Sequence, residues 1–146
     1  MQKILEKNYR YIVASILGIT SFISVLNAHN DSLIYDESAH IAAGYSYLTQ
    51  HDMRLNPEHP PLLKDIAALP LLFMDINFDT TQDFWNKDNA DDSQWNAGRS
   101  LLFESGNDPD RIIFWSRLPF IAIFVLLGLF IFKWTRELAG IPAGLF

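Results

Sequence analysis

The chain has 146 residues, no cysteine and a formal net charge of −6, with 17 acidic residues against 11 Lys and Arg. The lack of cysteine excludes disulfides and thiolate metal sites, and the acidic balance argues against nucleic acid as a partner, because that binding requires phosphate neutralisation. Apolar residues gather in two long runs around a polar, acidic middle, which is typical of a membrane protein with a large loop.

The first apolar run covers residues 11–28 and follows a short basic segment that contains Lys3, Lys7 and Arg10. A helix of about 18 residues covers roughly 27 Å, which is close to the hydrocarbon thickness of a bilayer. A cleaved signal peptide is the alternative, but the run is longer than a usual signal core and Leu26 is a poor residue before a cleavage site. We predict a cytoplasmic tail at 1–10 and a transmembrane helix at 11–28.

A loop at residues 29–117 follows, and its first predicted helix lies near 36–50. Apolar side chains recur there every three to four residues, and Asp31 or Ser32 could cap the helix start.

A second helix is predicted near 60–73, because Pro60 and Pro61 suit a first helical turn. It is too short to span a bilayer and suits the membrane interface. In the polar stretch 75–110 the acidic run of Asp88, Asp91 and Asp92 could bind calcium, but its spacing does not match an EF-hand loop, so we interpret the stretch as a solvated loop.

The second transmembrane helix is predicted at 118–134, with Arg117 before it and Lys133 and Arg136 after it. Basic residues at the cytoplasmic ends of both spans place the amino terminus inside and the loop in the periplasm or outside the cell. Residues 135–146 read as a cytoplasmic turn leading to a further span. The sequence predicts an all-α, multi-pass inner-membrane protein in which two transmembrane helices flank an extracytoplasmic loop with two interfacial helices.

Two adjacent carboxylates, Asp36 and Glu37, stand near the outer end of the first span. Neighbouring side chains on a helix point about 100° apart, so one carboxylate can face a substrate while the other makes a structural contact. His40 lies one turn after Asp36 and could tune its proton affinity. The alternative is that both acids only favour the positive end of the helix dipole.

The turn at His59 precedes two prolines, and Lys64 follows five residues later. These groups could hold a lipid-linked phosphate at the membrane surface. Alternatively, Glu58 and His59 cap the second helix and Lys64 extends to lipid head groups.

Three segments together resemble one family, the GT-C membrane glycosyltransferases, especially protein O-mannosyltransferase-like and aminoarabinose-transferase-like enzymes. They are DESAH at 36–40, NPEHPPLLKDIAALPLL at 56–72 and DPDRIIFWSRLP at 108–119. They are similar to the first extracytoplasmic loop and the entry to the second span. The resemblance covers only the amino-terminal part of such an enzyme, so we expect the remaining spans of a longer protein as partners and no activity from this fragment alone.

The resemblance implies transfer of a sugar from a polyprenyl-phosphate donor to an acceptor hydroxyl, with inversion. Asp36 matches the catalytic base and Glu37 would support it; His59 and Lys64 would contact the donor phosphate, with His40 and Glu58 in support. Some relatives use a divalent metal, for which Asp36, His40 and Glu58 could supply ligands.

Two departures from the family pattern leave the sugar open. Leu63 replaces the glycine usual in mannosyltransferases, and His59 replaces the lysine of aminoarabinose transferases. Two other functions stay open. One is a noncatalytic membrane subunit or truncated remnant. The other is a membrane metallohydrolase, since residues 36–40 are one histidine short of the His-Glu-x-x-His zinc motif.

Overall fold

A computed structural model describes residues 2–86 and 90–145 of the chain. Every regular element in these two ranges is helical, which confirms the predicted all-helical class. The chain forms two compact units, one made of Met1–Asn27 and Phe120–Phe146 and the other of Ala28–Pro119. Each is described by itself.

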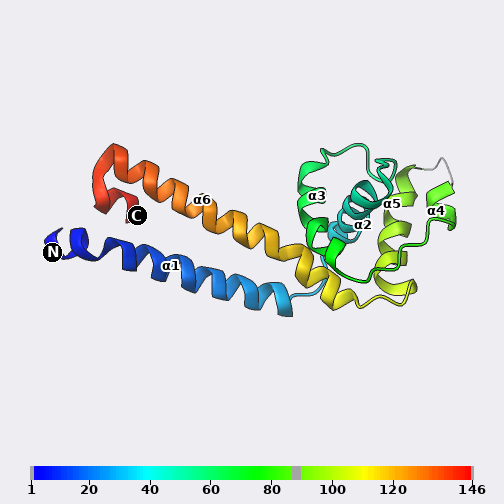
Figure 1. Cartoon of the computed structure of the whole chain (residues 1–146), viewed down its shortest axis with the longest axis horizontal. Helices are drawn as coiled ribbons and strands as arrows, with labels where there is room; N and C mark the ends of the chain where they lie inside the picture. Colours follow the sequence, from blue (N-terminus) through cyan, green and yellow to red (C-terminus); the bar gives the residue numbers. More distant parts are fainter. Residues whose placement is uncertain (1, 87–89, 146) are drawn as a thin grey trace. The chain divides into compact units, whose positions relative to one another are not determined.

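The first unit contains most of the two longest helices, α1 (Gln2–Asn30) and α6 (Pro109–Leu145), labelled in Figure 1. Both are long and apolar enough to cross a membrane. The rings of Tyr9 and Phe132 stack with centroids 5.8 Å apart, and Arg136 Nη1 donates to Tyr9 Oη at 3.2 Å. Large apolar side chains elsewhere on the pair are exposed, as expected of surfaces that face lipid.

Both helices extend past the apolar runs at 11–28 and 118–134. Hydropathy marks the part of a helix that fits a bilayer, whereas the helix itself continues wherever the flanking residues favour it. Gly140, with φ of 87°, interrupts α6 within the predicted turn. A Cβ added at Gly144 would lie 3.0 Å from the Phe132 carbonyl oxygen, so the last residues fold back against α6.

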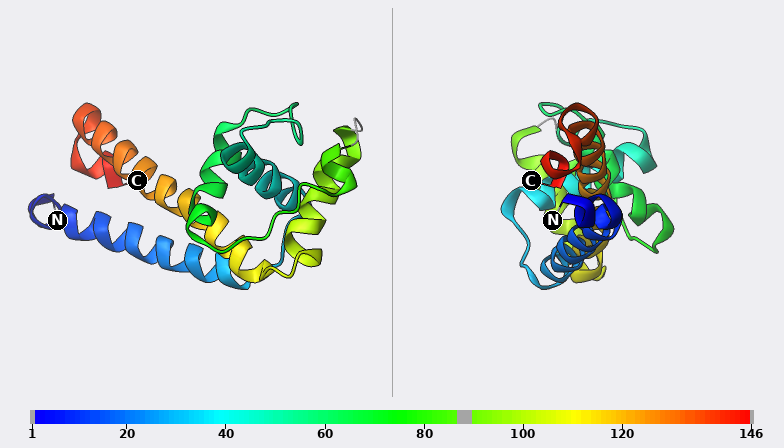
Figure 2. Two further views of the ribbon diagram at one scale, coloured as in Figure 1. Left: turned by 45° about the vertical axis from the view of Figure 1, so that its right-hand side comes forward. Right: turned by 90° about the vertical axis from the view of Figure 1, so that its left-hand side faces the viewer.

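The second unit is organised around α2 (Tyr35–Gln50), which lies between α3 (Leu62–Ala68) and α5 (Ala90–Arg99) in the views of Figures 1 and 2. A Cβ at Gly44 would stand 2.1 Å from the Lys64 carbonyl oxygen, and one at Gly98 would stand 2.6 Å from the Ser38 carbonyl carbon and oxygen. Glycine is therefore required at both crossings. Its residues from Ala39 to Tyr47 are almost all buried, so α2 is the central helix of this unit, and its predicted position at the membrane interface stays a prediction.

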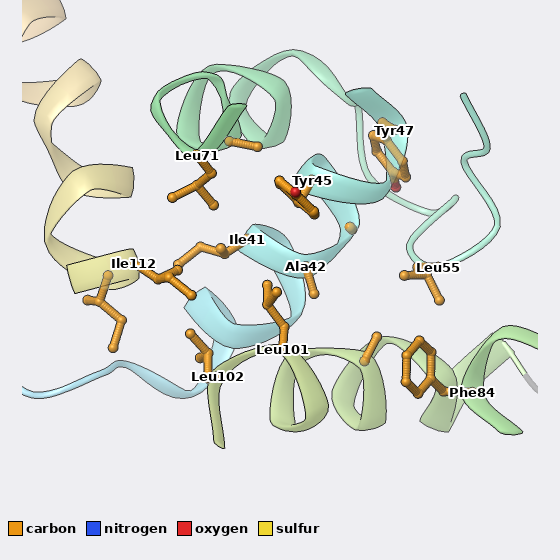
Figure 3. Close-up of a cluster of buried hydrophobic side chains, with 14 residues drawn as sticks. Ile41, Ala42, Tyr45, Tyr47, Leu55, Leu71, Phe84, Leu101, Leu102 and Ile112 are labelled. Carbon is orange, nitrogen blue, oxygen red and sulfur yellow. The ribbon is translucent and has the colours of Figure 1, made fainter. Parts of the chain in front are cut away.

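Helices also occupy much of the stretch 75–110, so its interpretation as a solvated loop is wrong. It contains α4 (Asp83–Asn86), α5 and the π-helix η2 (Ser100–Glu104), whose Ser105 N–H donates to the Ser100 carbonyl at 3.0 Å. Figure 3 shows Phe84, Leu101 and Leu102 pointing into the core beside α2. Asp88 and the side chains of Asp91 and Asp92 lie outside the described part of the chain.

After α3 the chain tightens into the 3₁₀ helix η1 (Leu69–Phe73). The second predicted helix, 60–73, is thus a short α-helix followed by a 3₁₀ turn, with Pro61 as the N-cap and Pro70 near the start of η1. Leu71 of η1, Ile41 of α2 and Ile112 of α6 converge in the core (Figure 3).

Candidate functional site

The start of α2 presents the two acidic residues singled out in the sequence. Ile34 is the N-cap residue, with extended φ and ψ, and its backbone N–H donates to the Glu37 carboxylate at 2.9 Å. Glu37 occupies the N3 position, where an acidic side chain satisfies a free backbone donor. The predicted caps, Asp31 and Ser32, do not serve this helix: Ile34 has no polar side chain, and Glu37 does the capping from inside.

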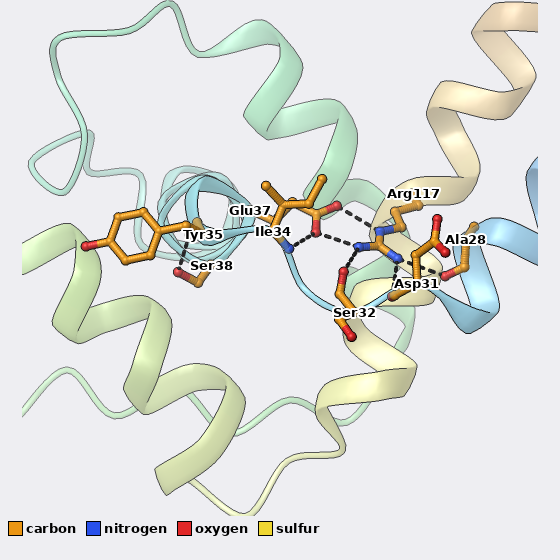
Figure 4. Close-up of polar contacts among 8 residues, drawn as sticks. All are labelled: Ala28, Asp31, Ser32, Ile34, Tyr35, Glu37, Ser38 and Arg117. Atoms are coloured by element: carbon orange, nitrogen blue, oxygen red, sulfur yellow. Dashed lines mark hydrogen bonds and ion pairs between the residues drawn. The ribbon is translucent and has the colours of Figure 1, made fainter.

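Glu37 is also locked by Arg117 from α6, as Figure 4 shows. The guanidinium donates from Nε to Oε1 at 2.8 Å and from Nη2 to Oε2 at 2.6 Å. Its other donors reach the backbone carbonyls of Ala28, Asp31 and Ser32 at 3.1, 2.9 and 3.0 Å. This is the two-pronged geometry that only arginine provides. We call these contacts the Arg117 clamp.

The clamp determines the ionisation of Glu37. Partial burial raises the pKa of Glu37, but the Arg117 hydrogen bonds, the Ile34 N–H and the Arg117 charge outweigh it and hold the pKa below its usual value. Glu37 is therefore ionised at neutral pH, with both oxygens engaged.

Asp36 is in the opposite situation. Its side chain is exposed, and it makes no hydrogen bond or ion pair with any residue in the described ranges. It acts on His40, one turn later, through its charge and without a hydrogen bond between the two. The two neighbouring carboxylates thus differ: Glu37 is held in an ion pair, whereas Asp36 is exposed and has no hydrogen-bond or ion-pair partner in the described ranges.

His40 faces the turn that carries His59. The two imidazole centroids are 5.7 Å apart with ring planes at 69°, and His40 Nδ1 is buried without a hydrogen-bond partner among the described residues. Partial burial lowers the pKa of His40, and the charges of Lys64 and His59 lower it further, against the opposing effect of Asp36 and Glu58. His40 is therefore neutral near pH 7. The His59 side chain is exposed beside it.

Lys64 lies inside the unit rather than at its surface, and only 4% of it is exposed. Its Nζ donates to the carbonyls of Asn56 and His59 at 2.6 and 2.9 Å, to Tyr47 Oη at 3.1 Å and to Asn56 Oδ1. Burial lowers the pKa of Lys64. In this arrangement the ammonium holds the 56–59 turn from within, and it does not face the exterior as a phosphate contact would.

The same turn is tied to α5 through Gln94. Asn56 Nδ2 donates to Gln94 Oε1, and Gln94 Nε2 donates to Glu58 Oε1 at 3.0 Å. Asn56 and Gln94 are buried, so their amide groups satisfy each other. The 56–59 turn is therefore held by two contacts: exposed Glu58 accepts a hydrogen bond from Gln94, and buried Lys64 donates to the backbone carbonyls of the turn.

The structure brings Asp36, His40 and His59 to one side of α2 and gives Glu37, Glu58 and Lys64 internal partners. Among the side chains that the structure describes, no group of three His, Asp or Glu is placed to hold a metal ion, and the divalent metal implied by the resemblance, with Asp36, His40 and Glu58 as ligands, stays a prediction. The sequence does not predict Arg117 as a partner of Glu37, because the two residues are 80 positions apart. No sequence spacing signals such a contact.

Comparison of the chain with protein-family models, with curated proteins and with solved structures finds no match.

Proposed function

We propose that this chain is part of an integral-membrane glycosyltransferase that moves a sugar from a polyprenyl-phosphate donor to an acceptor hydroxyl, with Asp36 as general base. One observation carries the proposal: Asp36 is exposed and unpaired within the described ranges, on a helix start that Glu37 and Arg117 hold in place. A free carboxylate on a rigid element is what proton abstraction requires.

In the proposed reaction the acceptor oxygen attacks the anomeric carbon while its proton passes to an Asp36 oxygen. A new bond forms between that oxygen and the carbon, and the bond from the carbon to the phosphate oxygen breaks on the opposite face. The polyprenyl phosphate leaves with the electron pair, so the anomeric configuration inverts. A phosphate leaves readily, which removes the need for a general acid.

Contact with the donor phosphate falls to His59 in this proposal, because its imidazole is exposed whereas Lys64 is enclosed. Lys64 acts through the turn: its bond to the His59 carbonyl at 2.9 Å fixes the backbone that carries the imidazole. Lys64 is thus a positioning residue.

The orientation proposed for the loop places it outside the cytoplasm. Lys7 and Arg10 precede the apolar run of α1, and Lys133 and Arg136 follow that of α6. Basic residues are retained on the cytoplasmic side of a membrane. The basic residues beside the two apolar runs therefore predict the same orientation. The lipid-linked donor would then be used on the outer face of the bilayer.

The test is Asp36→Asn in the protein with whatever further spans its reading frame encodes. We expect sugar transfer from radiolabelled polyprenyl-phosphate sugars to fall by about 10²–10⁴-fold, the usual contribution of a general base. Asp110→Asn is a matched control, since Asp110 is also exposed and also second in a helix, after Pro109 of α6. Both substitutions remove the same helix-dipole interaction.

Transfer by Asp36→Asn at the rate of the Asp110→Asn control, with both proteins in the membrane fraction, would refute Asp36 as the base. Absence of transfer from every donor by the unmodified protein would favour a noncatalytic membrane subunit.

A further inference from the structure

The segment 62–73, made of α3 and η1, has its amphipathic pattern reversed. Its buried face contains Ala67, Ala68, Leu71 and the cation Lys64. Its exposed side chains are the large apolar ones, and we call these the apolar ridge: Leu62 (65% exposed), Leu63 (59%), Leu69 (47%), Leu72 (44%) and Phe73 (90%).

A helix at a water-facing surface turns its apolar side chains inward and its charged ones outward. This segment does the opposite, because Lys64 finds four oxygen acceptors inside the unit. Five large apolar side chains are left outside within twelve residues of sequence. Large apolar side chains exposed so close together in the chain are typical of a surface that an apolar partner covers.

The position of the apolar ridge in the second unit indicates which apolar partner covers it. Leu71, on the buried side of the same 3₁₀ turn, packs in the core with Ile112 of α6. Ile112 precedes Leu118, the first residue of the apolar run, by about 1.7 helical turns, or roughly 9 Å along the axis. The ridge is thus carried by the part of the unit from which the chain enters a helix able to cross the membrane.

The charge distribution decides how such a surface would bind. The only charged residues in 62–73 are Lys64, which is buried, and Asp65, which is half-buried. The ridge therefore offers no basic group to an anionic lipid, and binding must come from burial of apolar area.

We propose that the apolar ridge inserts into the interfacial layer of the bilayer that α1 and α6 cross, and so holds the second unit against the membrane surface. The depth is that of an interfacial helix, about 5–10 Å into the boundary between head groups and acyl chains. The inference does not depend on sugar transfer, so it can stand or fall without the proposed function.

The test uses site-directed spin labels, which the absence of native cysteine makes unambiguous. Phe73→Cys places a label on the ridge, and Leu62→Cys places a second one in case the first variant fails to fold. Asn96→Cys, at an exposed polar position on α5, is the matched control. Each labelled protein is reconstituted in phosphatidylcholine nanodiscs, and its collisions with molecular oxygen and with a water-soluble nickel chelate are measured.

Oxygen concentrates in the acyl chains and the chelate stays in water. We expect the ridge labels to lose almost all collisions with the chelate and to gain collisions with oxygen relative to Asn96→Cys. The same values are expected when anionic lipid is added, because the ridge carries no basic side chain. Chelate access equal to that of Asn96→Cys would overturn the proposal by placing the ridge in water. Low access to both reagents would overturn it by showing that protein covers the ridge.

Discussion

Replacing Glu37 with glutamine tests whether the Arg117 clamp holds the candidate site together. The substitution leaves the Arg117 guanidinium with its carbonyl acceptors but without the carboxylate that accepts two of its hydrogen bonds, at 2.8 and 2.6 Å. A hydrogen bond to a charged group contributes about 1.5–3 kcal/mol, and loss of one partner of a buried pair costs about 3–5 kcal/mol.

The two side chains of the clamp are still 15% and 25% exposed, so solvent reduces this figure. We expect the free energy of unfolding of the second unit to fall by about 2 kcal/mol, which for a domain of this size lowers Tm by roughly 8–16 °C. Thermal unfolding in detergent can be followed by tryptophan fluorescence, since Trp95 stacks on Tyr35 beside the clamp with ring centroids 4.3 Å apart.

The pH dependence supplies a second readout. Because the pKa of Glu37 is lowered in the folded state, its stabilising effect is fully present above the unfolded-state pKa of about 4.3 and is lost as pH falls through the lower folded value. The difference between the native protein and Glu37→Gln should therefore be constant at neutral pH and disappear in acid.

The control for this experiment is Glu104→Gln. Glu104 pairs with Arg99 at 2.7 Å, but the two side chains are 45% and 73% exposed, so we expect a loss of less than about 0.5 kcal/mol. Glu37→Gln behaving like this control, or keeping its full deficit at low pH, would refute the clamp as a source of stability.

Two further predictions concern the packing of α2. Gly44→Ala should lower the stability of the second unit by about 1–3 kcal/mol, because its Cβ would stand 2.1 Å from the Lys64 carbonyl oxygen. The control is Gly18→Ala, which has open space around it and should leave the thermal midpoint unchanged or slightly raised. Equal thermal midpoints for the two variants would contradict the close crossing of α2 and α3. In detergent, an amine-acylating reagent should modify Lys64 far more slowly than the exposed Lys7, as measured by mass spectrometry of tryptic peptides; equal rates would show that Lys64 is open to a phosphate.

The sequence motif predicts that Lys64 faces a phosphate or lipid head groups, whereas the structure buries it. The reason lies in the sequence around Lys64. Apart from Asp65, the neighbours of Lys64 in α3 are apolar: Leu62 and Leu63 precede it, and Ile66, Ala67 and Ala68 follow. Periodicity cannot then tell which face is buried. The choice is made by Gly44, which brings α3 against α2, and by the oxygen atoms of Asn56, His59 and Tyr47 that surround Nζ.

The helix α5 was missed for a related reason. Residues 90–99 are mostly polar, and the described side that packs is made of Ser93, Gln94, Ala97 and Gly98, none of which is a large apolar residue. Small residues give no hydrophobic signal in a sequence, yet Gly98 is what allows α5 to approach Ser38 of α2. The contact is visible only once both helices are in place.

The sequence by itself determined the features that depend on local composition. Two apolar runs predict two helices able to cross a membrane, the paired prolines mark the start of α3, and Asp36 and Glu37 fall in the first turn of a helix. Only the tertiary structure decided how those two carboxylates differ, because the deciding partner, Arg117, is 80 residues away. It likewise decided that Lys64 is enclosed while its apolar neighbours are exposed. Burial and ion pairing depend on which elements meet, and that information does not reside in any one segment.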